Sequence, residues 1–226
     1  MDVTSFDEFK ELAQRGTFVP VYKEIVADLL TPVSAFLKIA EHSDYAFLLE
    51  SVEGGEHVGR YSFLGKDPFL ILRAREGKTI IDRAGQTAES DKPFIATLRE
   101  LMASFHSPFV PGLPRFTGGA VGYLGYDAAA WFEPVTLQSA GEAEDEGGFM
   151  LFDTVLAFDH VRHRILIIAN ARITGDEDLE SLYQFACAKI EFVEKNASRA
   201  MVKIRRINFI AARGVSSWQA PGRLAR

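Results

Sequence analysis

Cysteine, long apolar runs and a basic N-terminus are scarce or missing in this sequence of 226 residues. Its single cysteine, Cys187, excludes an internal disulfide and a zinc site built from cysteines, which agrees with a reducing compartment. No apolar run approaches the roughly 20 residues that span a bilayer. The N-terminus carries Asp2, Asp7 and Glu8 in place of the basic start and apolar stretch of a signal peptide. We therefore expect a cytoplasmic protein that has no membrane partner.

Acidic residues are missing from the last part of the chain, so its charge is unevenly distributed. The whole sequence has 25 Lys and Arg against 31 Asp and Glu. Residues 197–226 contain 7 of those bases and no acid, which leaves 25 − 7 = 18 bases against 31 acids in residues 1–196. An acidic body repels phosphate backbones and anionic membranes. We expect no nucleic-acid partner, and only the basic tail, residues 197–226, offers a phosphate-binding arm.

Helix and strand patterns follow each other irregularly over residues 1–196, and hydrophobic residues, 47% of the chain, are sufficient for a large core. Amphipathic stretches that open on capping residues predict helices at 5–15, 31–40, 93–105 and 174–193. Apolar or alternating runs predict strands at 18–23, 45–52, 57–64, 69–75, 78–82, 116–124, 149–158 and 165–169. The last two would form one long central hairpin. This order predicts an α+β fold, with a mostly antiparallel sheet or pair of sheets flanked by helices.

The familiar catalytic and metal-binding motifs are missing from the sequence, including G-x-S-x-G and H-E-x-x-H. The glycines of residues 118–125 have the wrong spacing for a nucleotide loop and favour a tightly packed strand. His160 and His163 fall at a predicted turn, and the acids of residues 142–146 lack the pattern of a calcium loop. Cys187 lies beside the apolar stripe of the last helix, as a packed thiol would. We expect no catalytic residue, metal ligand or cofactor in this chain.

The most unusual local feature is an apolar strand that ends in a carboxylate and a hydroxyl, Leu48-Leu49-Glu50-Ser51, just before a glycine turn. The return strand begins with Arg60. Such a strand end suits an amphipathic small ligand, because the leucines offer an apolar wall while Glu50 and Ser51 accept hydrogen bonds from an ammonium. A buried strand that reaches the surface at its turn gives the same pattern. The residues alone favour this second interpretation.

A family resemblance changes that balance. Residues 48–51, followed by residues 59–65, closely resemble the N-terminal region of anthranilate synthase component I, a chorismate-utilising enzyme family. Residues 17–24, 118–127 and 158–160 resemble further segments of the same family in the same order. The resemblance covers roughly residues 6–196. A related family, the aminodeoxychorismate synthase components, shares the architecture, and residues 59–65 favour anthranilate synthase over it.

The resemblance implies a role in tryptophan biosynthesis. In that family the complete enzyme is a lyase that converts chorismate to anthranilate and pyruvate, and Mg²⁺ holds the chorismate carboxylate. A glutamine amidotransferase subunit supplies the ammonia, and L-tryptophan inhibits the enzyme by feedback at an allosteric site. Carried over to this sequence, Ser51 and Glu50 would contact the tryptophan amino group or fix the backbone around it. Leu48 or Leu49 would line the indole, and Arg60 would support the site.

The same resemblance divides the chain in two. Residues 1–196 are expected to form the N-terminal domain of the family, and residues 197–226 a basic tail outside the fold, which a reading-frame shift near residue 197 would explain. The catalytic and Mg²⁺-binding residues of the family have no counterpart in this sequence. We therefore expect no anthranilate synthase activity from the chain alone. The alternative function is that of a self-standing noncatalytic module, which binds a small molecule or a partner.

Overall fold

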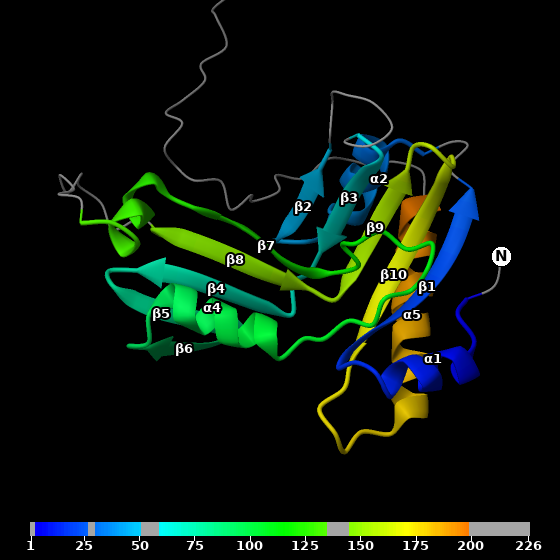
Figure 1. Ribbon diagram of the computed structural model, residues 1–226. Coiled ribbons are helices and arrows are strands. Elements are labelled where there is room, and N and C mark those ends of the chain that lie inside the picture. The colour runs from blue at the N-terminus through cyan, green and yellow to red at the C-terminus, as the bar shows by residue number, and fades with distance from the viewer. Residues whose placement is uncertain (1–2, 27–29, 51–58, 135–144, 199–226) are drawn as a thin grey trace, which may run out of the picture.

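The computed structural model describes residues 3–26, 30–50, 59–134 and 145–198, and the strands of this part form two antiparallel sheets (Figure 1). Sheet A has the strand order β1 (Phe18–Val26), β10 (Arg164–Arg172), β9 (Thr154–Asp159), β3 (Tyr61–Lys66) and β2 (Ala46–Leu49). Sheet B has the order β6 (Gln86–Ser90), β5 (Lys78–Arg83), β4 (Leu70–Arg75), β8 (Gly147–Phe152) and β7 (Gly119–Leu124). The predicted α+β fold is confirmed.

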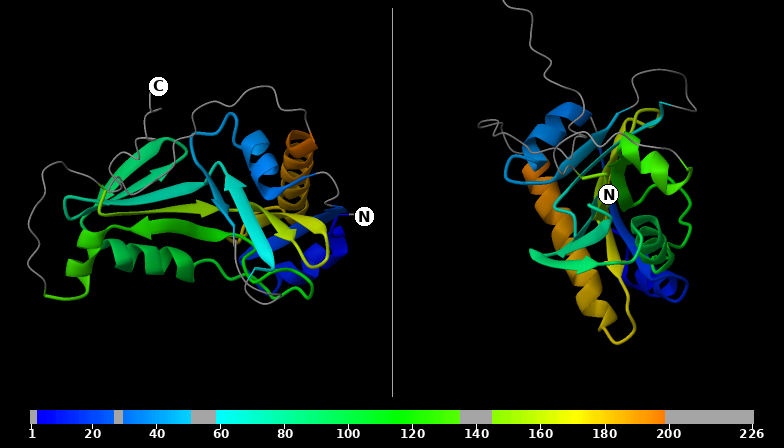
Figure 2. Two further views of the ribbon diagram at one scale, coloured as in Figure 1. Left: turned by 90° about the horizontal axis from the view of Figure 1, so that it is seen from above. Right: turned by 90° about the vertical axis from the view of Figure 1, so that its left-hand side faces the viewer.

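Helices pack against a face of each sheet (Figure 2). Sheet A carries α1 (Phe6–Ala13), α2 (Pro32–Ile39) and the long α5 (Leu179–Ser198), and sheet B carries α4 (Phe94–Ala103). A short 3₁₀ helix, η1 (Tyr126–Trp131), follows β7. One apolar cluster lies between sheet A and its helices, a second on the other face of sheet A, and a third beneath α4. Sheet A is therefore buried on both faces, on one by these helices and on the other by sheet B.

Short polar side chains begin α1, α2 and α5, as the sequence predicts for the first two, whereas α4 follows Pro93 without a side-chain cap. The Ser5 hydroxyl accepts from the backbone N–H of Glu8 at 3.2 Å, and Thr31 forms a capping box with Ser34. The predicted cap of the last helix, residues 174–177, is wrong. Asp178 takes that role, because the Glu177 carboxylate already accepts from Thr174 and Gly175 in a turn of its own.

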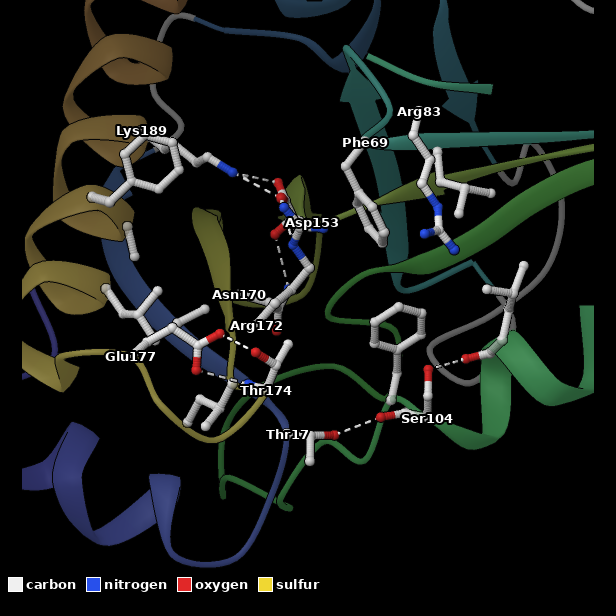
Figure 3. Close-up of a pocket in the computed structure, with 18 residues that line it drawn as sticks. Thr17, Phe69, Arg83, Ser104, Asp153, Asn170, Arg172, Thr174, Glu177 and Lys189 are labelled. Atoms are coloured by element: carbon white, nitrogen blue, oxygen red, sulfur yellow. Dashed lines mark hydrogen bonds and ion pairs between the residues drawn. The ribbon is translucent and has the colours of Figure 1, made fainter. Parts of the chain in front are cut away.

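The apolar run of residues 149–158 is two strands, so the predicted long central hairpin is wrong in its first half. β8 ends at Phe152 in sheet B, and β9 begins at Thr154 in sheet A. The residue between them, Asp153, is 7% exposed, and both of its carboxylate oxygens accept from Lys189 Nζ of α5 at 2.8 Å (Figure 3). The chain thus changes sheets at a buried carboxylate, which needs the charged partner that α5 supplies.

Gly118 and Gly122, before and within β7, are structural, as the spacing of these glycines predicts. A Cβ on Gly122 would lie 2.0 Å from the carbonyl oxygen of Gly148 in the neighbouring strand β8. A Cβ on Gly118, whose φ is +153°, would lie 2.7 Å from Asn170 Nδ2. Both positions bring backbone into close contact with a neighbouring element, which any larger residue would prevent.

Candidate functional site

The strand end that the sequence singles out lies at an edge of sheet A. Strand β2 pairs with β3 alone among the described strands, with Leu48 opposite Leu64 and Leu49 opposite Phe63. Leu48 packs against the apolar cluster beneath the helices, whereas Leu49 is 48% exposed. Glu50 follows as an exposed residue, and Ser51 lies outside the described residues. Of the two leucines, Leu49 is therefore the one that is open to a ligand.

The start of β3 and the end of β9 lie beside this strand end. The register pairs Tyr61 with Asp159 and Ser62 with Phe158. Ser62 is fully buried, and its hydroxyl lies 2.8 Å from Nε2 of His160 in the turn after β9. Because Leu49 pairs with Phe63 in an antiparallel register, Glu50 follows at this end of β3. The end of β2, the start of β3 and the β9–β10 turn thus lie at the same end of sheet A.

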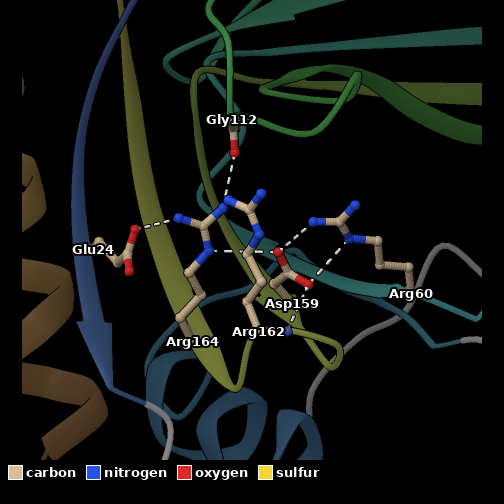
Figure 4. A network of polar contacts seen from close by, with 6 residues as sticks. All are labelled: Glu24, Arg60, Gly112, Asp159, Arg162 and Arg164. Carbon is tan, nitrogen blue, oxygen red and sulfur yellow. Dashed lines mark hydrogen bonds and ion pairs between the residues drawn. The ribbon is translucent and has the colours of Figure 1, made fainter. Parts of the chain in front are cut away.

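Asp159 is the centre of a charged network at the same end of the sheet (Figure 4). Its side chain is fully buried, and Arg60 donates to both carboxylate oxygens, from Nε at 3.1 Å and from Nη2 at 2.9 Å. The backbone N–H of Arg162 donates at 3.2 Å, and Arg164 Nε at 3.4 Å. Arg164 also pairs with Glu24 of β1. The network joins three neighbouring strands of sheet A to the segment before β3.

The pKa values show that both members of the central pair are charged. Burial by itself would raise the pKa of Asp159. The hydrogen bonds from Arg60 and from the Arg162 backbone, with the nearby guanidinium charges, outweigh burial and bring the pKa below its ordinary value. The hydrogen bond to Asp159 raises the pKa of Arg60. Arg60 is therefore committed to a structural ion pair, and its charge is neutralised where it stands beside the strand end.

The other sequence candidates take ordinary structural places. His160 and His163 lie in the β9–β10 turn, and the described residues contain no group of three or more His, Cys, Asp or Glu placed to hold a metal ion. Cys187 of α5 is partly buried, and burial raises the pKa of its thiol. Among the described helices, none is long and apolar enough to cross a membrane. The acids of residues 142–144 lie outside the described part.

Comparison with known proteins identifies relatives. No protein-family model matches the chain. Anthranilate synthase component 1 of Synechocystis sp. (strain ATCC 27184 / PCC 6803 / Kazusa) is 44% identical over 189 residues, which are 82% of this chain and 37% of that protein. Anthranilate synthase component 1 of Acetivibrio thermocellus is 39% identical over 197 residues, 84% of this chain and 38% of that protein. The chain is a homologue of the N-terminal part of anthranilate synthase component 1.

The homology confirms the resemblance and also fixes its extent. The chain spans less than two-fifths of the length of these anthranilate synthase relatives. A crystal structure of anthranilate synthase component I from Streptococcus pneumoniae TIGR4 has a TM-score of 0.47 to this chain at 24% identity. The similarity covers 75% of this chain and 36% of the chain in that crystal structure.

Sequence reasoning named Arg60 at this site of the anthranilate synthase homologue but missed its partner. Asp159 lies within residues 158–160, which resemble the family, and its 99-residue separation from Arg60 hides the pair in the sequence. Ser62 and His160 were missed as a pair for the same reason. The available signal was an aspartate at the end of an apolar strand, since a buried carboxylate requires a cation from elsewhere. It does not say which cation.

Proposed function

We propose that this chain forms the tryptophan-sensing N-terminal part of an anthranilate synthase component 1, and that the end of β2 contacts the inhibitor. The observation that carries the proposal is the 44% identity to such a component over 82% of the chain. The half-exposed Leu49, followed by the exposed Glu50 at a sheet edge, supports the location. In the complete enzyme, chorismate and ammonia would yield anthranilate and pyruvate, with feedback inhibition by L-tryptophan.

The strand end has the chemistry that a buried amino acid needs. Leu49 offers an apolar surface to an indole ring, and the Glu50 carboxylate has no ion-pair partner among the described residues, so it is free to accept from an ammonium. Arg60 does not repel that ammonium, because Asp159 neutralises it. Its part in the proposal is to fix the start of β3 beside the strand end. Ser51 would add a further hydrogen-bonding group.

The remaining steps of the whole enzyme are assigned to parts beyond this chain. We propose that Mg²⁺ and chorismate bind to residues with no counterpart here, and that a glutamine amidotransferase subunit delivers ammonia to them. This chain would contribute the regulatory site and no group that touches chorismate. Purified chain is accordingly expected to produce no anthranilate from chorismate, ammonia and Mg²⁺, and measurable turnover would contradict the assignment.

Calorimetric titration of the full chain with L-tryptophan tests the site. Glu50→Gln keeps the size of the side chain but removes its charge, so tryptophan affinity should fall about tenfold or more, the value of one hydrogen bond to a charged group. Leu49→Ser should also weaken binding. Val33→Ser on α2 is the matched control, because Val33 is 46% exposed and Leu49 is 48% exposed. It should leave the affinity unchanged.

Two results would reject the strand-end site. One is an absence of heat when wild-type chain meets millimolar L-tryptophan, and the other is equal affinity in wild type, Glu50→Gln and Leu49→Ser. Titration with D-tryptophan serves as the ligand control, since a site that places ammonium and indole on separate groups should discriminate between the two hands.

A further inference from the structure

A cavity of about 700 Å³ lies at the start of β9, whereas the strand end of β2 lies beside the end of β9 (Figure 3 shows the cavity). It opens where the end of β10 and the side of α5 meet the start of β4 and the residues that close α4. Asp153 lines it, whereas Asp159 at the opposite end of β9 belongs to the network described above. Its volume falls within the roughly 300–1,000 Å³ typical of small-molecule sites. It is therefore a separate candidate site.

Both carboxylates on the cavity wall are already occupied. Asp153 accepts twice from Lys189 and has Arg172 Nε at 3.8 Å. Glu177 accepts from the Thr174 hydroxyl and from the backbone N–H groups of Thr174 and Gly175, at 3.0 and 2.9 Å. These bonds, with the Thr174 hydroxyl contributing most, lower the pKa of Glu177 to about 2. Lys189 thus neutralises Asp153, and Glu177 is held by donors of its own turn.

Two of the cationic side chains on the cavity wall keep hydrogen-bond donors that have no partner among the described residues. Lys189, Arg172 and Arg83 line the cavity with the two acids, which gives an excess of one positive charge. The guanidinium of Arg172 lies 4.4 Å over the ring of Phe69, and its contact with Asp153 runs through Nε, which leaves its terminal nitrogens without a partner among the described residues. Arg83 is exposed and has no ion-pair partner in the same described part. The free donors therefore suit an anion.

Aromatic rings form another part of the wall. Phe69 and Phe105 meet edge to face, with ring centroids 5.7 Å apart, and Leu101 lies beside them on the lining. The two rings stand nearly perpendicular and form an apolar wall next to the Arg172 guanidinium, against which a further aromatic ring can pack. A ligand that uses both features has a carboxylate at one end and a planar apolar body at the other.

We propose that this cavity binds a small aromatic carboxylate, with its carboxylate on Arg172 and its ring against Phe69 and Phe105. The site is selective against amino acids, because an ammonium would meet Lys189 and Arg172 on a wall whose net charge is positive. This distinguishes it from the strand-end site, where a free carboxylate is present. The two proposed sites consist of different residues, so an experiment that rejects one of them does not reject the other.

Titration of the full chain with sodium benzoate tests the proposal, with benzamide as the uncharged counterpart and L-phenylalanine as the zwitterionic one. Benzoate should bind at least about tenfold more tightly than either, because only benzoate brings an unopposed charge to the arginines. Arg172→Gln should weaken benzoate binding about tenfold or more. Arg75→Gln is the matched control, since Arg75 and Arg172 both have side chains 46% exposed and both contact an aspartate.

The outcomes divide clearly. Loss of benzoate affinity in Arg172→Gln but not in Arg75→Gln, with thermal unfolding of both variants close to wild type, supports the site. Benzoate affinity is also measured in Arg83→Gln. The exposed Arg83 side chain has no ion pair among the described residues, so its removal should not disturb the fold. Equal binding of benzoate and benzamide, equal affinity in wild type and Arg172→Gln, or no benzoate binding at millimolar concentration would each overturn the proposal.

Discussion

Replacing Asp159 with asparagine should strongly destabilise the fold. The Asp159 side chain is fully buried and accepts two hydrogen bonds from Arg60, one from the Arg162 backbone and one from Arg164. Removing one member of a buried ion pair typically costs about 3–5 kcal/mol. Arg60 is 33% exposed, so water partly solvates it after the change, and Arg164 keeps its pair with Glu24. Both facts favour the lower end of that range, about 3 kcal/mol.

Urea unfolding followed by circular dichroism at neutral pH measures this loss. Asp7→Asn is the control, because Asp7 pairs with Lys10 while 89% exposed, and surface pairs contribute under about 1 kcal/mol. A double-mutant cycle with Arg60→Gln isolates the pair itself, and a coupling energy of at least about 1 kcal/mol is expected for groups in direct contact. A loss below about 1 kcal/mol in Asp159→Asn would refute the assignment of a buried, paired carboxylate.

The pH dependence of the stability independently tests whether the charged form of Asp159 stabilises the fold. The pKa of Asp159 is lowered in the folded protein from an ordinary value of 3.8. Its contribution is therefore fully present above that value and is lost as the pH falls through the lower folded-state pKa. The difference in the free energy of unfolding between wild type and Asp159→Asn should be constant above about pH 5 and shrink below about pH 4. A difference that grows on acidification would contradict the argument.

Two further substitutions test the packing of the sheets. Gly122→Ala places a Cβ 2.0 Å from the Gly148 carbonyl oxygen, so thermal unfolding should show a loss of about 2 kcal/mol or more, whereas Gly77→Ala, which meets no atom within 4 Å, should lose only the smaller cost of its positive φ. Asn170→Asp should cost about 3 kcal/mol near neutral pH, because the Asn170 amide donates to two backbone carbonyls at 2.7 and 3.0 Å and a carboxylate would repel both. Equal stability of the two glycine variants, or an unchanged melting temperature in Asn170→Asp, would show that these contacts are wrongly assigned.

Local sequence signals predict most of the elements because each reflects short-range chemistry. Ser5 and Thr31 cap their helices through backbone N–H groups three residues away. Pro20 lacks the N–H that a central strand would use, and β1 is an edge strand of sheet A. Strand β6 was missed because its side chains are mostly exposed and polar, so no apolar alternation marks it.

The division into two sheets was beyond the reach of such signals. Residues 149–158 form one apolar run, and both β8 and β9 are buried, so hydrophobicity is the same on either side of the change of sheet. Only pairing partners distinguish the strands, since β8 pairs with β4 and β7 whereas β9 pairs with β10 and β3. Partners far apart along the chain leave no periodic trace in the sequence.

The candidate site shows the same limit. The pattern of apolar residues followed by polar ones found Leu49 and Glu50, and the structure leaves Leu49 half-exposed at a sheet edge. The pattern did not decide which leucine faces outward, because that depends on the register with β3. The family resemblance gave Arg60 a supporting role at the site, without the buried Asp159 that holds it.

Two aspartates, one before β9 and one at its end, explain why distant parts of the chain must be present together. Asp153 and Asp159 are 7% and 1% exposed, and each is neutralised by a cation from another element: Lys189 of α5 and Arg60 before β3. A buried carboxylate that loses its cation costs several kcal/mol, a large share of the stability of a domain. Sheet A is therefore favourable only when α5 and the residues before β3 are both in place. A chain cut before α5 would keep every strand of sheet A and still leave Asp153 without its strongest partner.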